Sequence, residues 1–212
     1  LARQRRQLAM LSDSALKDLG WSRADILEES KRPFWDDPLR RGVTPESGVF
    51  SRHNRGGAVM QYQLAQVNIA RARAALDQPL MQGFVEQLEH INALAERSPG
   101  FVWRLQGDSG DATAIQLFDD PLIIVNLSLW QSVVALKDYV YSGEHLAVLR
   151  SKREWFDKLP VASLALWWVP AEQLPTLEQA KAALQSVQAR GATAQAFTFA
   201  QPFAPGTGTL LG

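Results

Sequence analysis

The residues of this sequence that are best suited to chemistry are polar side chains set within otherwise hydrophobic segments. The set consists of Gln66, Asn68, Arg104, Asn126, Ser128 and Trp130. Because buried polar groups need hydrogen-bonding partners, amides, a guanidinium and an indole brought together suit an apolar pocket with a few orienting donors. Trp168, in a later hydrophobic run, would add a wall to that pocket. The alternatives are a structural hydrogen-bond network, or an interface at which Arg104 pairs across a dimer.

His145 is the histidine whose surroundings favour a reaction. Tyr141 precedes it by four residues, so the two side chains would share one helix face, and Gly143 leaves room for a substrate. Imidazole can act as a general acid or base, and it can also ligate haem. We therefore predict catalytic roles for His145, Tyr141 and Arg104 without a cofactor. The alternatives are haem ligation by His145, or a histidine with no role in a reaction.

A short basic segment follows His145 and precedes Trp155. It contains Arg150, Lys152 and Arg153. We predict that Arg150 contacts a ligand, because a guanidinium can capture an anionic group; a solvated helix end that complements the helix dipole is the alternative. The sequence has no glycine-rich phosphate loop after a strand, no histidine and carboxylate set with metal-ligand spacing, and no nucleophile elbow. These absences disfavour nucleotide-dependent and metal-dependent chemistry.

Hydrophobic periodicity predicts the elements that would position these residues. Four main strands are expected, over residues 62–69, 101–106, 122–130 and 164–169. Helices are expected over 79–97, over 132–156 with a kink at Ser142-Gly143, and over 177–190. The order β-α-β-β-α-β is that of a ferredoxin-like α+β unit.

Strand alternation assigns the polar set to one face of the sheet. In the central strand Ile123, Val125, Leu127 and Leu129 point one way, and Ile124, Asn126, Ser128 and Trp130 point the other way. We expect the wholly apolar side to face the two covering helices, and the polar side to lie on the reverse. The reverse face would be bare in a single chain, so we predict a homodimer that closes two sheets into a dimeric α+β barrel.

A family resemblance supports this architecture. The motifs that carry it are LAQVNIAR, FVEQLEHINALAERSPGFVWRLQ, GDATAI, NLSLWQSVVALKDYVY, EHLAVLRSKREWF and LWWVPA. Over residues 64–203 they resemble the family catalogued as domain of unknown function 3291. The resemblance implies the dimeric α+β barrel superfamily, whose members include cofactor-free monooxygenases, haem enzymes and simple binding proteins. It implies no particular activity.

The N-terminal part reads as a separate unit. We expect a short helical segment over residues 1–36, a linker rich in glycine and proline over 37–60, and the α+β domain over 61–212. Residues 3–35 resemble the small family catalogued as domain of unknown function 1127, some of whose members bind RNA. The resemblance permits RNA binding through Arg3, Arg5 and Arg6; a solvated helix face is the alternative.

Composition limits the remaining choices. The 212 residues carry no net charge and contain no cysteine, so disulfides, thiolate metal sites and cysteine nucleophiles are excluded. No apolar run reaches the roughly 20 residues of a membrane-spanning helix, and we expect a cytoplasmic protein. The leading hypothesis is a barrel that binds a small apolar or aromatic molecule, as a cofactor-independent monooxygenase or isomerase. The second is a non-enzymatic regulator whose N-terminal helices bind RNA or a protein.

Overall fold

A five-stranded antiparallel sheet forms the centre of the molecule. The computed structural model describes residues 61–106 and 118–211, so the predicted N-terminal helical segment and linker lie outside the described residues. The strands are β1 (Tyr62–Ala72), β2 (Phe101–Arg104), β3 (Ile123–Trp130), β4 (Phe156–Asp157) and β5 (Leu164–Pro170). The long strand β1 is central, because β3 pairs along one side of it while β5 and the short β4 share the other.

The connections between the strands are those of a ferredoxin-like unit. The helices are α4 (Gln82–Glu96), α5 (Val133–Val140), α6 (Gly143–Arg150), α7 (Lys152–Trp155) and α8 (Leu177–Arg190), and a 3-10 turn (Pro79–Met81) precedes α4. Helix α4 connects β1 to β2, and the helices α5, α6 and α7 connect β3 to the last two strands. Apart from the two-residue strand β4, the strands lie in the order β5-β1-β3-β2. The predicted β-α-β-β-α-β order is confirmed.

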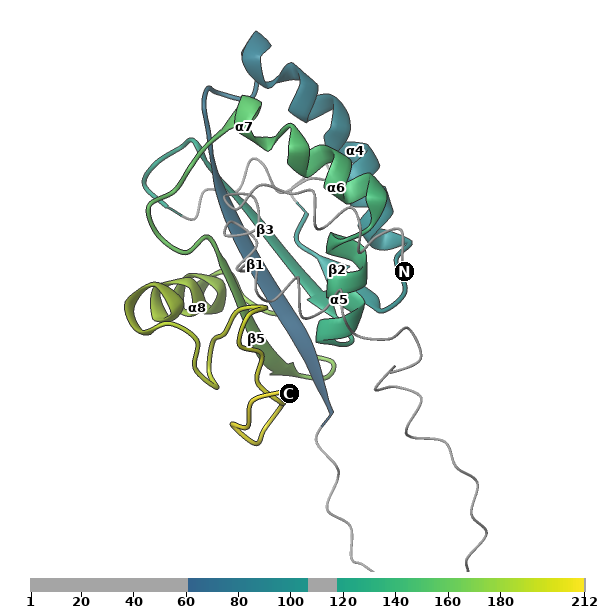
Figure 1. Ribbon diagram of the computed structural model, residues 1–212, viewed down its shortest axis with the longest axis vertical. Coiled ribbons are helices and arrows are strands. Elements are labelled where there is room, and N and C mark those ends of the chain that lie inside the picture. Colours follow the sequence, from purple (N-terminus) through teal and green to yellow (C-terminus); the bar gives the residue numbers. More distant parts are fainter. Residues whose placement is uncertain (1–60, 107–117, 212) are drawn as a thin grey trace, which may run out of the picture.

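The two faces of the sheet are covered by different helices (Figure 1). Helices α4 to α7 lie over one face, and α8 lies against the other, where it contacts β5 and β1. Val125, Leu127 and Leu129 pack with Ala183 and Leu184 of α8. The apolar side of β3 therefore faces α8, and the polar side lies under α4 to α7. The predicted alternation holds along β3, but the expectation that the polar side faces away from the two connecting helices is wrong.

Helix α8 can cover the apolar face because it presents a flat side of small and aliphatic residues. Its buried residues are Ala180, Ala183, Leu184 and Val187. Thr176 caps the helix in a capping box with Gln179, and Gly191 ends it. The polar face, which was expected to be bare, lies under α4 to α7, and α8 covers the apolar face within the same chain. The homodimer stays a prediction, and a bare sheet face is no longer a reason for it.

A bulge in β2 changes the expected direction of one aromatic side chain. The pairing of β2 with β3 shifts register between Phe101 and Trp103. Phe101 consequently packs edge-to-face on Trp130, with ring centroids 5.4 Å apart, while Trp103 packs with the core on the α8 side. Regular alternation would place Phe101 and Trp103 on one face of the sheet, but the extra residue of the bulge reverses it.

The helical passage after β3 is broken into separate helices rather than kinked. Helix α5 ends at Val140 with Tyr141 as its C-cap. Ser142 has an extended ψ of 145°, and its hydroxyl accepts a hydrogen bond from the backbone N–H of His145 at 3.3 Å. Ser142 is thereby the N-cap of α6, which begins with a new axis.

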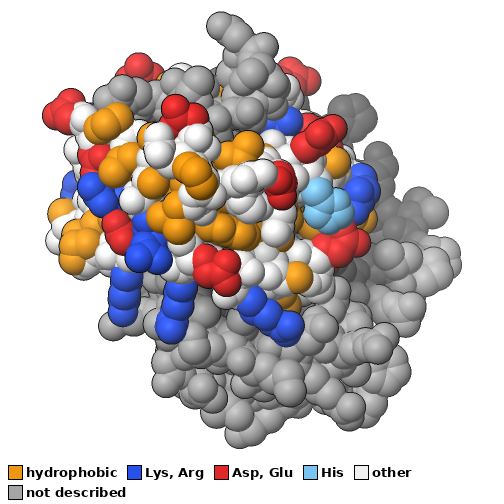
Figure 2. Space-filling model, turned by 90° about the horizontal axis from the view of Figure 1, so that it is seen from above, with side chains coloured by type: hydrophobic (Ala, Val, Ile, Leu, Met, Phe, Trp, Pro, Cys, Tyr) orange, Lys and Arg blue, Asp and Glu red, His pale blue; other side chains and the backbone are white. Residues whose placement is uncertain are grey.

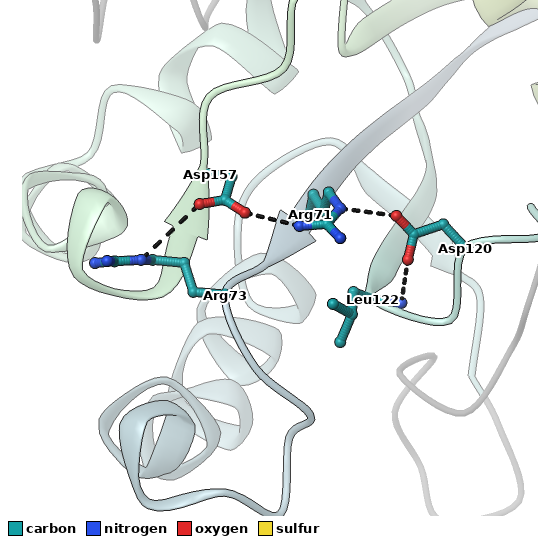
Figure 3. Close-up of polar contacts among 5 residues, drawn as sticks. All are labelled: Arg71, Arg73, Asp120, Leu122 and Asp157. Atoms are coloured by element: carbon teal, nitrogen blue, oxygen red, sulfur yellow. Dashed lines mark hydrogen bonds and ion pairs between the residues drawn. The ribbon is translucent and has the colours of Figure 1, made fainter.

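Ion pairs at the end of β1 hold neighbouring segments together (Figure 3). Arg71 Nε donates to Asp120 at 2.7 Å, and Arg71 Nη1 donates to Asp157 of β4 at 2.8 Å. The backbone N–H of Leu122 donates to the other oxygen of Asp120 at 2.9 Å. This bond, followed by the hydrogen bond from Arg71, lowers the pKa of the Asp120 carboxyl. One guanidinium thus joins the segment before β3 to the short strand β4.

Candidate functional site

A cavity of about 210 Å³ lies between the sheet and the helices α4 to α7. Its sheet side is polar and is formed by Gln66, Asn68, Arg104, Asn126, Ser128 and Trp130. Its helix side is mostly apolar and includes Phe84, Leu88, Ile91, Leu136, Val140 and Val148. The volume exceeds that of an engineered apolar cavity of about 150 Å³ that binds benzene. A substituted aromatic ring or a bicyclic molecule matches this size.

Figure 2 shows the end of the molecule at which α4 begins and α7 lies. Hydrophobic side chains gather at the centre of this face, and Lys, Arg, Asp and Glu side chains surround them. Leu80 and Val85, near the start of α4, are exposed to 47% and 40%. An apolar surface bordered by charges is therefore present at this end.

Hydrogen bonds link four side chains along the polar side of the cavity. The indole N–H of Trp130 donates to Ser128 Oγ at 2.9 Å, and the Ser128 hydroxyl donates to Gln66 Oε1 at 2.8 Å. The Gln66 amide then donates to Asn68 Oδ1 at 3.0 Å. Cross-strand register explains the contacts, because Gln66 lies opposite Ser128 and Asn68 lies opposite Asn126. The chain satisfies the buried polar atoms of Ser128 and Gln66, which are each only 6% exposed.

Three aromatic rings lie in contact beside this chain. Trp130 is stacked on Tyr139 with ring centroids 5.0 Å apart and an interplanar angle of 24°. The Tyr139 ring in turn lies 4.8 Å from the His145 ring. Burial raises the pKa of the Tyr139 hydroxyl far above its usual range, while the positive charge of Arg104 acts in the opposite direction. Tyr139 is therefore a neutral phenol that can donate a hydrogen bond to a ligand.

His145 lines the cavity as a neutral imidazole with a defined tautomer. Its Nδ1 lies 2.9 Å from the Val140 carbonyl oxygen, and a carbonyl only accepts, so Nδ1 carries the proton. Burial lowers the pKa of His145 to about 4, the hydrogen bond to Val140 opposes this, and the charge of Lys152 adds to it. At neutral pH Nε2 is left as an unprotonated acceptor. This atom suits a ligand hydroxyl, and the low pKa makes it a weak base.

Arg104 contributes a cation close to the cavity wall. Its side chain is 13% exposed, and its Nε donates to Glu96 of α4 at 2.8 Å. The ion pair connects β2 to the helix that covers it. Lys152 also lines the cavity, so positive charge lies on both its sheet side and its helix side.

The structure gathers most of the residues that the sequence predicted for the site. Seven line the cavity, namely Gln66, Asn68, Arg104, Asn126, Ser128, Trp130 and His145. Their roles in binding or catalysis stay predictions. Asn126 is exposed, which places it at the solvent side of the group.

Three predicted residues do not line the cavity. Tyr141 is buried in the core, because the helix boundary at Ser142 removes the four-residue spacing that would have aligned it with His145. Trp168 lies on the expected side of β5, but the C-terminal segment covers it and its indole N–H donates to the Phe203 carbonyl at 2.7 Å. Arg150 is exposed at the end of α6. The sequence predictions of site contacts for these residues are not supported by their positions.

Other residues take the places that these three were expected to fill. Tyr139 contacts His145 in place of Tyr141, and Lys152 lines the cavity in place of Arg150. Trp155 and Asn92 also line it. A helix boundary set at Ser142, which is a good N-cap residue followed by Gly143, would have pointed to Tyr139. Asn92 lies in the predicted helix, between the apolar residues Ile91 and Leu94, and polar residues in that pattern are usually solvent-facing.

Comparison with known proteins places the main part of the chain in a family. A family model described as Domain of unknown function (DUF3291) matches residues 63–210, which is more than half of the chain. The chain belongs to the DUF3291 family. The resemblance over residues 64–203 is confirmed, and the cavity lies wholly within the DUF3291 match.

The N-terminal residues match a different model. Residues 1–27 match the YjiS-like domain. The expected relation of residues 3–35 to domain of unknown function 1127 is not shown by this match, and these residues lie outside the described structure. A search of curated proteins finds no match.

Solved structures with distant similarity to this DUF3291 protein include proteins from several microorganisms. SnoaB, a cofactor-independent oxygenase from Streptomyces nogalater, is 18% identical, with 54% of this chain and 98% of SnoaB covered and a TM-score of 0.38. A conserved protein from Methanosarcina mazei is 13% identical, with 50% of this chain and 92% of that protein covered and a TM-score of 0.38. PA3566 from Pseudomonas aeruginosa is 13% identical, with 55% of this chain and 98% of PA3566 covered and a TM-score of 0.37. The assignment of the ferredoxin-like unit rests on the strand order of the chain itself.

Two kinds of feature are absent from the part of this DUF3291 chain that the structure describes. Residues 61–106 and 118–211 contain no cluster of three or more His, Asp or Glu side chains that could hold a metal ion. None of the helices in the same ranges has the length and apolar character needed to cross a membrane.

Proposed function

We propose that this protein binds a small, largely apolar or aromatic molecule in the cavity between the sheet and helices α4 to α7. The observation that carries the proposal is the combination of an apolar helix side with an ordered polar chain on the sheet side of one cavity of about 210 Å³. Ligand sites typically have this composition, with a few fixed polar groups in apolar surroundings.

The binding test fills the cavity and compares it with a matched surface change. The probe is 1-naphthol, a bicyclic molecule with one hydroxyl group, titrated by isothermal calorimetry. Ala70 lines the cavity, whereas Ala147 is exposed on α6. We expect Ala70→Phe to weaken 1-naphthol binding at least tenfold and Ala147→Phe to leave it unchanged. Equal binding by both variants and the wild type would place the ligand elsewhere.

The finer proposal concerns the reaction. We propose cofactor-independent oxygenation or isomerisation of the bound molecule, both of which begin with removal of a proton from the ligand. The ligand hydroxyl would transfer its proton to His145 Nε2, which becomes a transient imidazolium, and Arg104 would stabilise the ligand anion that forms. Asn68 and Asn126 would orient the ligand. Tyr139 takes the place that the sequence analysis assigned to Tyr141, because it is the tyrosine that lines the cavity.

An oxygen electrode separates the two reactions. Conversion of 1-naphthol to 1,4-naphthoquinone consumes one O₂ and releases one water, so substrate, oxygen and product can be measured together. We expect oxygen uptake by the wild type and loss of uptake, with binding retained, in His145→Gln. If the wild type takes up no more oxygen than buffer alone, the proposal that it oxygenates 1-naphthol is wrong. The binding proposal is tested separately by calorimetry.

A further inference from the structure

The hydrogen bonds beside the cavity form a chain with one direction. Its first member, the Trp130 indole, can only donate, and Trp130 is fully buried. Ser128 Oγ accepts from the indole at 2.9 Å and passes its own proton to Gln66 Oε1 at 2.8 Å. Gln66 therefore turns its oxygen toward Ser128 and its NH₂ toward Asn68, to which it donates at 3.0 Å.

The reverse orientation of the two amides is disfavoured. If the Gln66 amide turned over, its NH₂ would face Ser128 Oγ, and the Ser128 hydroxyl proton would lose its acceptor. Ser128 is only 6% exposed, and a buried donor without an acceptor costs about 1–3 kcal/mol. Asn68 would then also have to turn. A donor-only indole at one end thus fixes the orientation of Asn68 at the other end.

Asn68 consequently offers donors to whatever occupies the cavity. Its Oδ1 is used by Gln66, and among the described residues no hydrogen bond engages its Nδ2. Asn68 lines the cavity and lies directly across from Asn126. An NH₂ group held in this way is complementary to an acceptor oxygen and not to another N–H group.

We propose that the cavity selects molecules with a carbonyl oxygen, which Asn68 Nδ2 binds, and that Trp130, Ser128 and Gln66 are positioning residues for this recognition. The ligand class is a mono- or bicyclic ketone of aromatic character. The inference deepens the proposed function and rests on it, because it needs a ligand in this cavity. A site built to donate to an acceptor discriminates against an analogue that lacks the acceptor, since its own donor then stays unpaired.

The test compares two molecules that differ only in the carbonyl group, α-tetralone and tetralin. We expect the wild type to bind α-tetralone about tenfold more tightly, as one hydrogen bond of favourable geometry provides. Gln66→Met keeps the side-chain length but removes the donor to Asn68. Its preference for α-tetralone over tetralin should fall to less than about threefold. Gln63→Met, on the same strand and away from the cavity lining, is the matched control and should keep the wild-type preference.

An infrared spectrum of the bound ketone reports the contact directly. In the wild type and in Gln63→Met the carbonyl band of α-tetralone should shift to lower wavenumber relative to an apolar solvent, and in Gln66→Met the shift should shrink. Ser128→Ala, which interrupts the chain one step earlier, provides a second variant if Gln66→Met does not fold. Equal wild-type affinity for both molecules, or a preference and band shift that survive in the folded variant, overturns the proposal. Failure of both molecules to bind a wild type that binds 1-naphthol overturns this proposal alone, and failure of all three molecules to bind overturns the proposed function with it.

Discussion

Tyr139 and His145 lie with their ring centroids 4.8 Å apart, although they belong to different helices. Tyr139 is near the end of α5, and His145 is in the first turn of α6, whose start Ser142 caps. The hydrogen bond from His145 Nδ1 to the Val140 carbonyl spans the same boundary. The break between α5 and α6 is therefore what brings a neutral imidazole and a neutral phenol to one wall of the cavity.

Stability should fall with acid because of His145. Its pKa is lowered from 6.5 to about 4 in the folded protein, so between these values the unfolded chain binds a proton that the folded chain does not. The contribution of the neutral His145 side chain to the free energy of unfolding is therefore complete above pH 6.5, and it is lost as the pH falls toward 4. We expect the free energy of unfolding by urea to drop by about 2 kcal/mol between pH 7 and pH 5 on account of His145.

His145→Gln is the control for this pH dependence, because its amide can still donate to the Val140 carbonyl and does not titrate. Its stability should change less between pH 7 and pH 5 than that of the wild type, by about the amount assigned to His145. An identical pH dependence in both proteins would mean that His145 is not held neutral by burial.

The Tyr139 ring, rather than its hydroxyl, should carry its contribution to stability. The ring stacks on Trp130 and contacts His145, whereas no hydrogen bond with another described residue engages its hydroxyl. We expect Tyr139→Phe to leave the free energy of unfolding nearly unchanged, and Tyr139→Ala to lower it by about 3–5 kcal/mol. Urea unfolding measures both. A large loss in Tyr139→Phe would reveal a hydroxyl partner.

The sequence could predict the strands and the grouping of the polar residues because alternation along a strand depends only on local geometry. Gln66, Asn68, Asn126 and Ser128 face one cavity for that reason. Which helix covers which face depends on tertiary packing. Here α8 packs on the apolar face through a buried side that includes Ala183. Periodicity along a strand does not contain that information.

Tyr141 and Trp168 lie outside the cavity for equally specific reasons. Tyr141 was aligned with His145 by assuming one helix across Ser142, and the side chain of that serine starts a new helix instead. Trp168 has the predicted direction, yet a carbonyl from Phe203, 35 residues later in the chain, binds its indole. Contacts of this length are set by the path of the C-terminal segment, which hydrophobic patterning does not describe.

Arg71 should control the local opening of β4 more than global stability. It bridges Asp120 and Asp157 at 2.7 and 2.8 Å, but all three side chains are more than one-third exposed, so salt screens the pairs. We expect Arg71→Gln to speed hydrogen exchange at the backbone N–H of Arg73, which donates to the Trp155 carbonyl at 2.8 Å, while α8 exchange is unchanged. Arg97→Gln, which removes an exposed ion pair with Glu144 of α6 away from β4, is the control. Equal exchange in both variants would show that Arg71 does not hold β4.

Gly100, which lies between α4 and β2, should tolerate a side chain less well than Gly208 in the C-terminal segment. Its φ of +84° is unfavourable for an L residue, and a Cβ there would lie 2.4 Å from Ala135 Cβ of α5. Backbone strain and overlap together predict that Gly100→Ala lowers the free energy of unfolding by about 2–4 kcal/mol.

The matched control is Gly208, which also has a positive φ, of +66°, but a Cβ there would meet Ala194 Cβ at an ordinary 3.7 Å. Gly208→Ala should therefore cost only the conformational part, about 1–2 kcal/mol. Urea unfolding of the two variants measures the difference, and equal losses would mean that α5 moves away from Gly100 at no cost.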